Sequence, residues 1–185
     1  MEISPYTVSM RVVAGYLGGR VFESPHSHNV HPMSDKMRGA LFNALGDING
    51  LTVLDAFAGS GAMSIEAISR GAKHATAIDI DNDAFKTIQR NVGALGIENQ
   101  ITVLRKNARG WASNNQDRKF DLVLADPPYD NIDPSVLTKI ITLVKDGGLF
   151  VLSWPGKEPV RAFEGLTQLQ ANSYGDSQLV FYRKA

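Results

Sequence analysis

The sequence contains no cysteine, and this absence excludes several kinds of chemistry. Disulfide bonds, zinc sites built from thiolates and a cysteine nucleophile all require that residue. The chain also has no run approaching the roughly 18 apolar residues that a membrane-spanning helix needs. Its N-terminal residues lack the basic start and the apolar segment of a secretory signal. We therefore expect a cytoplasmic protein with no membrane partner.

An excess of charge of either sign is missing as well. The 185 residues include 19 Lys and Arg and 19 Asp and Glu, so the formal net charge is zero. A protein that coats nucleic acid without regard to sequence is normally strongly basic. Any nucleic-acid contact must therefore come from a local patch or from shape. With 43% hydrophobic residues, the chain is long enough to form one domain with a substantial core.

From residue 51 onward, short apolar runs alternate with segments of helical periodicity. We expect strands at residues 51–55, 74–79, 101–104, 120–126 and 149–154, and helices at 62–70, 85–95 and 136–144. Gly71, Gly96 and the pair Gly147-Gly148 are expected to end these helices. Two last strands, near 165–171 and 177–183, predict an antiparallel edge hairpin. The expected fold class is α/β and Rossmann-like, with a seven-stranded, mostly parallel sheet.

The segment before this sheet has a different pattern. Residues 10–24 alternate short apolar and polar stretches around glycines, which predicts a β-hairpin. A polar stretch at 24–32 predicts a loop, and Ser34 is a suitable N-cap for the helix that follows. We therefore divide the chain into an N-terminal hairpin and loop, residues 1–33, and a main domain, residues 34–185.

A glycine loop follows the first strand of the expected sheet. Asp55 ends this strand, and Gly59 and Gly61 allow a tight turn at which a ligand can approach bare backbone. The helix that begins after them favours a carboxylate or a phosphate at its N-terminus. Asp79 ends the second strand, 18 residues after Gly61, close to the roughly 20 residues typical of an acid that binds a ribose diol. These features indicate a nucleoside cofactor.

The residues around the loop favour one such cofactor. The third glycine of the dinucleotide fingerprint is replaced by Ser64, and the Gly-Lys-Ser/Thr motif of phosphate loops is absent. Asp55 would repel phosphates but would attract an ammonium or sulfonium group. S-adenosylmethionine (SAM) carries both cations, together with a carboxylate that suits a helix N-terminus. The sequence therefore favours SAM over NAD, FAD or ATP.

A second motif follows the fourth strand. Here Asp126, Pro127, Pro128 and Tyr129 form a stiff turn, because two prolines cannot continue a central strand. Asp126 and the Pro127 carbonyl can accept the two hydrogens of an exocyclic amine, and Tyr129 can stack on the face of a base. This arrangement would aim the nitrogen lone pair at a methyl group. We interpret these four residues as the catalytic motif of an amine methyltransferase.

With these motifs in place, the chain resembles the RsmD-type 16S rRNA guanine-N2 methyltransferases, within the class I SAM-dependent superfamily. The resemblance covers residues 10–184 and is strongest at LDAFAGSGAMSIEAISRGA (54–72) and ADPPYD (125–130). It implies methyl transfer from SAM to the exocyclic N2 amine of a guanine, in 16S rRNA or in a small-subunit assembly particle. Residues 55–61 would hold the methionine part of SAM, Asp79 the ribose, and Ile80, Asn107 and Ala108 the adenine. The predicted cofactor-binding residues are Asp55, Phe57, Ala58, Gly59, Ser60, Gly61, Asp79, Ile80, Asn107 and Ala108.

Because the net charge is zero, contacts to the RNA backbone must come from local basic patches. We predict contacts from the hairpin and the first helix, namely Arg11, Arg20, Lys36 and Arg38. A second cluster, of Arg105, Lys106 and Arg109, is the alternative. His26, His28 and His31 lie on a polar loop with no nearby acid beyond Glu23, so we expect no metal site. We also expect a monomer.

The sequence departs from the family pattern at two places. The family pattern usually has Arg-Pro-Thr where this chain has His31-Pro32-Met33, and a Glu where it has Gly39.

DNA adenine-N6 or cytosine-N4 methyltransferases use a similar motif on a flipped base, but the chain is short for their recognition domains. A protein glutamine methyltransferase favours Asn in place of Asp126. A SAM-binding or RNA-binding module without catalysis would not need the intact motif.

Overall fold

The computed structural model describes residues 8–25 and 32–185 of the chain. The elements in chain order are β1 (Ser9–Arg11), β2 (Val21–Glu23), α1 (Asp35–Leu45), β3 (Thr52–Asp55), α2 (Ala62–Ser69), β4 (His74–Asp79), α3 (Asn82–Leu95), β5 (Ile101–Arg105), α4 (Ala108–Asn114), β6 (Phe120–Ala125), the 3₁₀ turn η1 (Tyr129–Asn131), α5 (Pro134–Ile141), β7 (Val144–Pro155), β8 (Leu166–Tyr174) and β9 (Ser177–Lys184).

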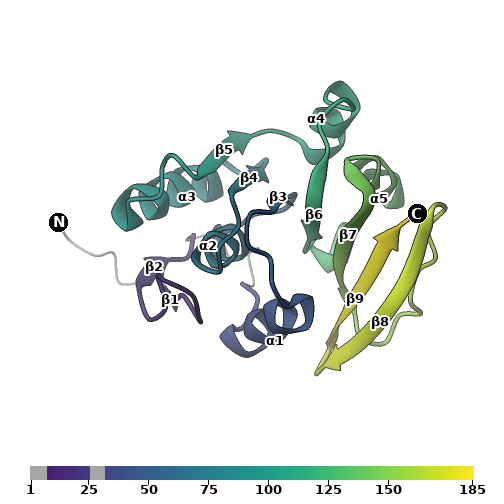
Figure 1. The fold of residues 1–185 in the computed structure, drawn as a ribbon, viewed down its shortest axis with the longest axis horizontal. Coiled ribbons are helices and arrows are strands. Elements are labelled where there is room, and N and C mark those ends of the chain that lie inside the picture. Colours follow the sequence, from purple (N-terminus) through teal and green to yellow (C-terminus); the bar gives the residue numbers. More distant parts are fainter. Residues whose placement is uncertain (1–7, 26–31) are drawn as a thin grey trace.

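A seven-stranded sheet forms the centre of the structure, with the strand order β5-β4-β3-β6-β7-β9-β8. The strands from β5 to β7 are parallel, and β9 pairs antiparallel with both β7 and β8. Figure 1 shows the β8–β9 hairpin at one edge of this sheet. The predicted fold class, including the antiparallel C-terminal hairpin, is therefore confirmed.

The central strands β3, β4 and β6 are buried on both faces, so neighbouring residues along one strand enter different cores, whereas the edge strand β8 is largely exposed. Val53 packs with residues of α1, α2 and α3, including Phe42, Ile65 and Ile88. The next residue, Leu54, packs on the opposite face with Trp111 of α4 and Leu137 of α5. This two-sided burial is typical of parallel sheets and explains why the strand sequences are almost continuously apolar.

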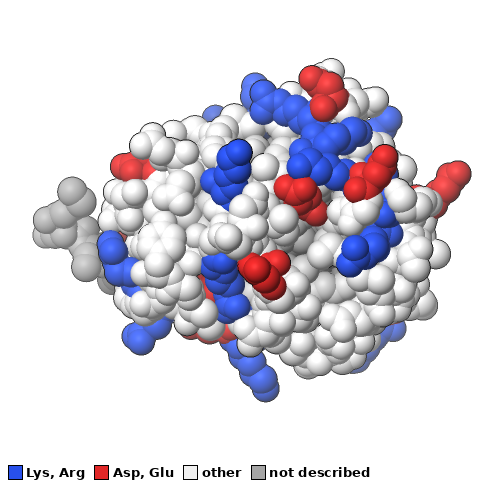
Figure 2. Space-filling view, viewed as in Figure 1, with Lys and Arg blue, Asp and Glu red and all other residues white. Residues whose placement is uncertain are grey.

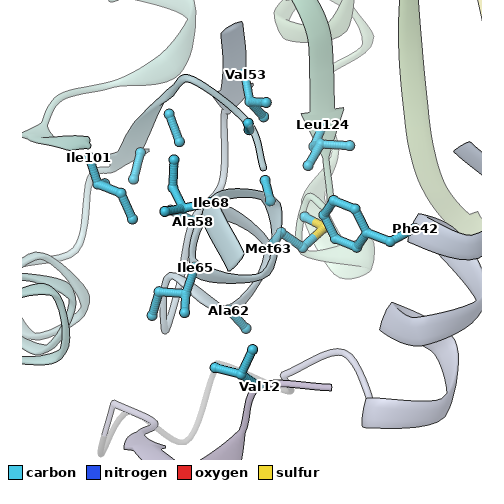
Figure 3. Packing of buried hydrophobic residues seen from close by; sticks show 14 of the residues in the cluster. Val12, Phe42, Val53, Ala58, Ala62, Met63, Ile65, Ile68, Ile101 and Leu124 are labelled. Atoms are coloured by element: carbon cyan, nitrogen blue, oxygen red, sulfur yellow. The ribbon is translucent and has the colours of Figure 1, made fainter. Parts of the chain in front are cut away.

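The first of these cores is centred on α2. Figure 3 shows Met63 of α2 reaching the ring of Phe42 of α1, and Leu124 of β6 belongs to the same cluster, as do Ile65 and Ile68 of α2. All eight residues of α2 are buried. A helix that is apolar or fully enclosed on every side is a fixed core element, and α2 begins directly after the glycine loop.

Two expectations for the second half of the chain are wrong. The sequence was not expected to form a helix at 108–114, yet α4 forms there, with Asn107 as its N-cap. The helix expected at 136–144 ends at Ile141, because Val144 already pairs with Phe120 in the sheet. The Gly147-Gly148 pair therefore lies inside β7, next to a register shift in its pairing with β6, where glycine tolerates the irregular backbone.

The predicted N-terminal hairpin is present as β1 and β2, which pair antiparallel, and β2 packs against α3. The buried carboxylate of Glu66 on α2 accepts hydrogen bonds from the backbone N–H groups of Val13 and Ala14, at 2.9 and 3.0 Å. On α3, Asn91 bonds both backbone groups of Glu23. These polar contacts hold the segment in one position against α2 and α3.

Candidate active site

Three carboxylates lie close together at the carboxyl ends of the parallel strands. Asp55 ends β3, Asp79 ends β4 and Asp126 follows β6, and β3 lies between the other two strands. The parallel pairings place the carboxyl ends of these strands side by side. In open α/β sheets, ligands bind at the carboxyl ends of the strands. The structure therefore brings the predicted acids together.

The side chain of Asp55 is fully buried and only partly hydrogen-bonded. Its Oδ2 accepts from the backbone N–H of Ser64 at 3.2 Å and from the Ser64 hydroxyl at 2.8 Å. Its Oδ1 is buried and has no hydrogen-bond partner among the residues that the structure describes. Burial raises the pKa of Asp55 to about 7 against the lowering effect of the Ser64 bonds, and the charges of Asp126 and Asp79 raise it further. A carboxylate in this state favours a cationic hydrogen-bond donor.

The glycine loop has the conformation that the motif requires. Gly59 and Gly61 have φ values of 55° and 81°, in the left-handed region where side chains are disfavoured. A Cβ on Gly61 would also lie 3.1 Å from Ile88 Cγ2. Gly61 is the N-cap of α2, and no side chain caps the helix at this position. In the first turn, the Ala62 N–H donates to Ser60 Oγ at 3.3 Å and the Ser64 N–H donates to Asp55 Oδ2 at 3.2 Å, so the N-terminus of α2 favours a carboxylate through the helix dipole and its remaining donors.

Asp79 joins the glycine loop to β4. Its Oδ2 accepts from the N–H of Gly59 at 2.8 Å, and its Oδ1 accepts from the N–H of Asp81 at 2.9 Å. Burial raises the pKa of this carboxyl. The sequence suggested only a ribose contact, and the structure adds a role in fixing the loop. Each oxygen retains a lone pair for a further donor.

The remaining predicted cofactor residues surround this loop. Ala58 donates its N–H to the Ile78 carbonyl, Ser60 is buried, and Phe57 packs against the second core. Ile80 is 63% exposed, which is unusual for a large apolar side chain and fits the expectation that it flanks a base. Asn107 caps α4 through the Gly110 N–H, and Ala108 is the first residue of that helix.

The catalytic motif lies beside the glycine loop, at the end of β6. Burial raises the pKa of Asp126, and a hydrogen bond from the Ser153 hydroxyl acts in the opposite direction. Pro127 is buried and Pro128 is exposed at the start of η1. Tyr129 is 36% exposed, and its phenol oxygen lies 2.6 Å from Ser153 Oγ and 3.1 Å from Ser177 Oγ.

Ser153 on β7 and Ser177 on β9 were missed by sequence reasoning. Nothing local to either serine marks it, since Ser153 lies within an apolar run and Ser177 within the C-terminal strand. The relevant signal is the strand order, which places β7 next to β6 and β9 next to β7. Only with that order known do these hydroxyls come beside the catalytic motif.

The predicted RNA-backbone residues fall into two groups. Arg11, Arg20 and Lys36 are exposed, and Arg20 makes one long bond to the Ala94 carbonyl at 3.4 Å. Arg38 is fully buried, so the prediction that it contacts RNA is wrong. Its guanidinium donates to the carbonyls of Met33 and Arg11 and pairs with Asp35, while its buried Nε makes no hydrogen bond among the described residues.

Of the positions that depart from the family pattern, the structure describes Met33 and Gly39. His31, like His26 and His28, lies outside the described residues. Met33 is buried, and a Cβ on Gly39 would lie 3.3 Å from the Val13 side chain of the N-terminal segment. Gly39 therefore lets this segment approach α1 closely.

The visible face of the molecule carries both signs of charge. Figure 2 shows Lys and Arg side chains gathered where Figure 1 places α4 and α5, with acidic side chains among them. Arg109 of α4, for example, lies 3.5 Å from Asp133. Among the described residues, no cluster of three or more metal-ligating side chains occurs, and no helix is long and apolar enough to cross a membrane.

The fold and the site together define a class I SAM-dependent methyltransferase. The Asp55 oxygen that lacks a partner among the described residues fits the ammonium of SAM, and the glycine loop at the N-terminus of α2 fits its carboxylate. The exposed Ile80 beside Asp79 fits its adenosine. The motif at residues 126–129 lies next to these groups and presents acceptors for an amine.

Comparison with known proteins identifies the family. The chain belongs to the family described as conserved hypothetical protein 95, which matches residues 10–183. It is 33% identical to the ribosomal RNA small subunit methyltransferase D of Escherichia coli, over 75% of this chain and 68% of that protein. It is 29% identical to a putative rRNA methyltransferase of Bacillus subtilis, over 95% and 99% of the two chains. The resemblance to the RsmD-type enzymes is therefore confirmed.

Solved structures agree on the fold. A putative methyltransferase from Escherichia coli has a TM-score of 0.85 at 24% identity, with 96% of this chain and 98% of that chain covered. A putative methylase from Haemophilus influenzae has a TM-score of 0.79 at 25% identity, with 96% and 99% covered. The N-terminal hairpin and the C-terminal strands thus belong to a shared architecture.

Proposed function

We propose that the protein transfers a methyl group from SAM to the exocyclic N2 amine of a guanine in small-subunit ribosomal RNA. The observation that carries this proposal is the position of the catalytic motif, Asp126 to Tyr129, beside the glycine loop at the same sheet edge. Relatives named ribosomal RNA small subunit methyltransferase D support the choice of substrate. The acid at position 126 also matches an amine target better than an amide.

The residues of the site would divide the work as follows. Asp55 and the first turn of α2 would hold the amino acid end of SAM, Asp79 the ribose, and Ile80, Asn107 and Ala108 the adenine. Phe57, Ala58 and Ser60 would shape the loop between them. When bound, SAM supplies an electrophilic methyl group on its sulfonium. The remaining chemistry belongs to the target amine and to the motif at residues 126–129.

The guanine amine is a poor nucleophile because its lone pair is delocalised into the ring. Asp126 and the Pro127 carbonyl would accept its two hydrogens and turn the lone pair toward the methyl group, while Tyr129 stacks on the base. Positive charge grows on the nitrogen during attack, and the Asp126 carboxylate stabilises it. Because burial raises the pKa of Asp126, this carboxylate is also suited to accept the proton that leaves afterwards.

The exposed basic residues Arg11, Arg20 and Lys36 are the proposed contacts to the RNA backbone. They lie on the N-terminal segment and at the start of α1, which we propose act together as an RNA-binding extension, with residue 33 as its boundary. The substrate is 16S rRNA or a small-subunit assembly particle, the protein acts as a monomer, and its place of action is the cytoplasm.

The test is methyl transfer from radiolabelled SAM to four pools taken from a strain that lacks the gene: 16S rRNA, small-subunit particles, DNA and protein. We expect label in N2-methylguanine of small-subunit rRNA, at one site that is unmodified in the deletion strain. The rRNA and particle pools distinguish naked RNA from an assembly intermediate. Label in DNA or in glutamine of a protein would contradict the proposal, and so would an absence of label in all four pools.

A further inference from the structure

A groove lies between the start of α1 and the turn that joins β8 to β9, and Figure 1 shows these two elements next to each other. Its volume is about 330 Å³, at the lower end of the range of roughly 300–1,000 Å³ that is typical of small-ligand sites. A groove of this size has room for one nucleotide but not for a duplex. The residues that line it are Ser34, Lys36, Met37, Ser173, Tyr174 and Gly175.

The β8–β9 hairpin connects this groove to the catalytic motif. Tyr174 at the end of β8 pairs directly with Ser177 at the start of β9. Opposite residues of an antiparallel pair lie on the same face of a sheet. Leu179, two residues further along β9, packs in the core that contains α1, so this is the face that α1 covers. Ser177 Oγ accepts a hydrogen bond from the Tyr129 hydroxyl at 3.1 Å. Tyr174 is therefore one cross-strand pair away from the Tyr129 hydroxyl.

The side chains of the groove suit the parts of a nucleotide. Lys36 is exposed, and its ammonium suits a phosphate. The Ser34 hydroxyl accepts from the Met37 N–H at 3.2 Å, which leaves its proton for an acceptor on the ligand. Tyr174 is half-buried and packs against the first core, so its ring is supported from within. A supported aromatic ring beside a cation is the usual arrangement for binding an unpaired base and its backbone.

Two acids lie near the groove, and neither cancels the charge of Lys36. Asp35 is adjacent to it in the sequence, but its carboxylate pairs with Arg38 at 2.9 Å. Asp176 follows Gly175 in the turn and does not line the groove. The groove therefore offers a positive charge to its ligand, next to the motif that would hold the target base.

We propose that this groove binds the nucleotide next to the target guanine, with its base on the ring of Tyr174 and its phosphate at Lys36. The inference rests on the proposed function, which assigns the target base to Tyr129. It adds a requirement on the substrate, because the neighbouring base must be unpaired to enter the groove. Stacking does not depend strongly on the identity of the base, so the groove selects for an unpaired neighbour rather than for one sequence.

The first experiment removes the ring of Tyr174. Single-turnover methylation is measured at saturating SAM on the rRNA or particle pool that takes up label, while the protein concentration is varied. Tyr174→Leu keeps an apolar side chain but loses the stack, so the concentration for half-maximal rate should rise about 5- to 100-fold. Tyr174→Phe keeps the ring and should stay within about twofold of wild type. Calorimetry should show unchanged SAM affinity in both variants, which also confirms that they fold.

Matched controls lie elsewhere on the surface. Leu169→Ala removes an exposed apolar side chain from the same strand, outside the groove, and should leave the half-maximal concentration unchanged. Lys36→Met should lower the slope of log affinity against log salt by somewhat less than one unit. Lys73→Met removes an exposed charge just before β4, at the opposite end of the strand from the site, and should leave the slope unchanged.

The second experiment changes the RNA instead. The base on each side of the methylated guanine is replaced, one at a time, by an abasic site. On one of these two RNAs the wild-type protein should lose about the factor that Tyr174→Leu loses on intact RNA, and Tyr174→Leu should lose nothing further there. This arm uses the wild-type protein as well, so it decides the matter even if Tyr174→Leu does not fold.

Two results overturn the inference. One is a half-maximal concentration for Tyr174→Leu within about twofold of wild type, or no loss by the wild-type protein on either abasic RNA. The other is a loss in Tyr174→Leu that is equally large on intact and on both abasic RNAs, which would mean that the groove takes another partner, such as a protein of the particle. A wild-type protein that methylates no RNA would instead count against the proposed function, so the two failures are distinguishable.

Discussion

Arg38 Nε lies 3.5 Å from Glu66 Oε2, and both side chains are fully buried. The pair joins α1 to α2. Glu66 also accepts the backbone N–H groups of Val13 and Ala14, and Arg70 pairs with its other oxygen at 2.8 Å. Buried charges that are paired and hydrogen-bonded in this way are costly to separate. The pair therefore fixes the position of the N-terminal segment on α1 and α2.

Replacing Arg38 should destabilise the protein rather than weaken RNA binding directly. Arg38→Met leaves the buried Glu66 without one of its partners, and the expected loss in the free energy of unfolding is about 3–5 kcal/mol. Urea unfolding measures this loss. Lys36→Met, two residues away on the exposed side of α1, is the matched control and should change stability by at most about 0.5 kcal/mol. Equal stability of the two variants would contradict the structural role of Arg38.

Asp55 should link stability to pH and to SAM binding. Its pKa is raised to about 7 in the folded protein from 3.8, so its contribution to stability is present below pH 4 and is lost as the pH rises to about 7. Between pH 4 and pH 8, the free energy of unfolding of the wild type should fall by up to about 4 kcal/mol more than that of Asp55→Asn. Chemical unfolding at the two pH values measures this difference.

The same carboxyl predicts how SAM affinity depends on pH. Binding of an ammonium needs ionised Asp55, so affinity should decrease as the pH falls below about 7, approaching tenfold per pH unit. Calorimetric titration from pH 5 to 8 tests this, with Asp55→Asn as the control that should bind weakly and show little dependence on Asp55 titration. A flat profile in the wild-type protein would exclude the proposed contact.

Asp79→Ala should reduce SAM affinity by more than the loss of one ribose contact. A hydrogen bond to a charged group contributes about 1.5–3 kcal/mol. The substitution also releases the Gly59 N–H that Asp79 Oδ2 accepts. Asp79→Asn keeps one side-chain oxygen, and we expect it to retain part of the affinity. Calorimetry with SAM and with methionine separates the two roles, because only the loop role affects methionine. Unchanged SAM affinity in Asp79→Ala would remove this residue from the cofactor site.

Asp126→Ala should retain near-normal SAM affinity and lose two or more orders of magnitude in the rate of transfer. The reason is that Asp126 acts on the amine rather than on the cofactor. Tyr129→Ala should weaken base capture, and Tyr129→Phe should restore part of it because stacking needs only the ring. Single-turnover rates at saturating SAM and RNA provide the measurement. An Asp126→Ala protein that works at nearly the wild-type rate would refute the mechanism.

Neutralising the exposed residues Arg11, Arg20 and Lys36 to Gln should weaken RNA binding and reduce its salt dependence. Each phosphate contact that is lost should lower the slope of log affinity against log salt by somewhat less than one unit. The control is the corresponding triple change at Arg105, Lys106 and Arg109. If only this control set changes the slope, the RNA backbone lies over α4 instead.

Patterns along the chain were sufficient for most of the fold and for the acids of the site. Alternation of apolar runs with helical periodicity locates the strands, and Asp55, Asp79 and Asp126 are recognisable because each follows such a run. The helix α4 was missed because its seven residues carry few apolar positions. The apolar spacing of α5 continues to Val144, so only pairing with β6 reveals that this residue belongs to a strand.

Other parts of the site depend on contacts between distant segments, which no local pattern encodes. In the sequence, Arg38 cannot be distinguished from an arginine that binds RNA. Its burial beside Glu66 shows that its role is structural. Ser153 and Ser177 become relevant through the order of β6, β7 and β9. The second role of Asp79, on the Gly59 N–H, likewise requires the loop to fold back over β4.

The eight residues of α2 connect two surfaces that the proposed function uses separately. The helix begins at Ala62, directly after its N-cap Gly61 in the loop for SAM, while Glu66 and Ser69 further along it bind the N-terminal segment that carries Arg11 and Arg20. Because a short, fully packed helix moves as one body, a displacement at one end is a displacement at the other. Thermodynamic reciprocity then applies to the two ligands: whatever RNA does to the affinity for SAM, SAM does to the affinity for RNA.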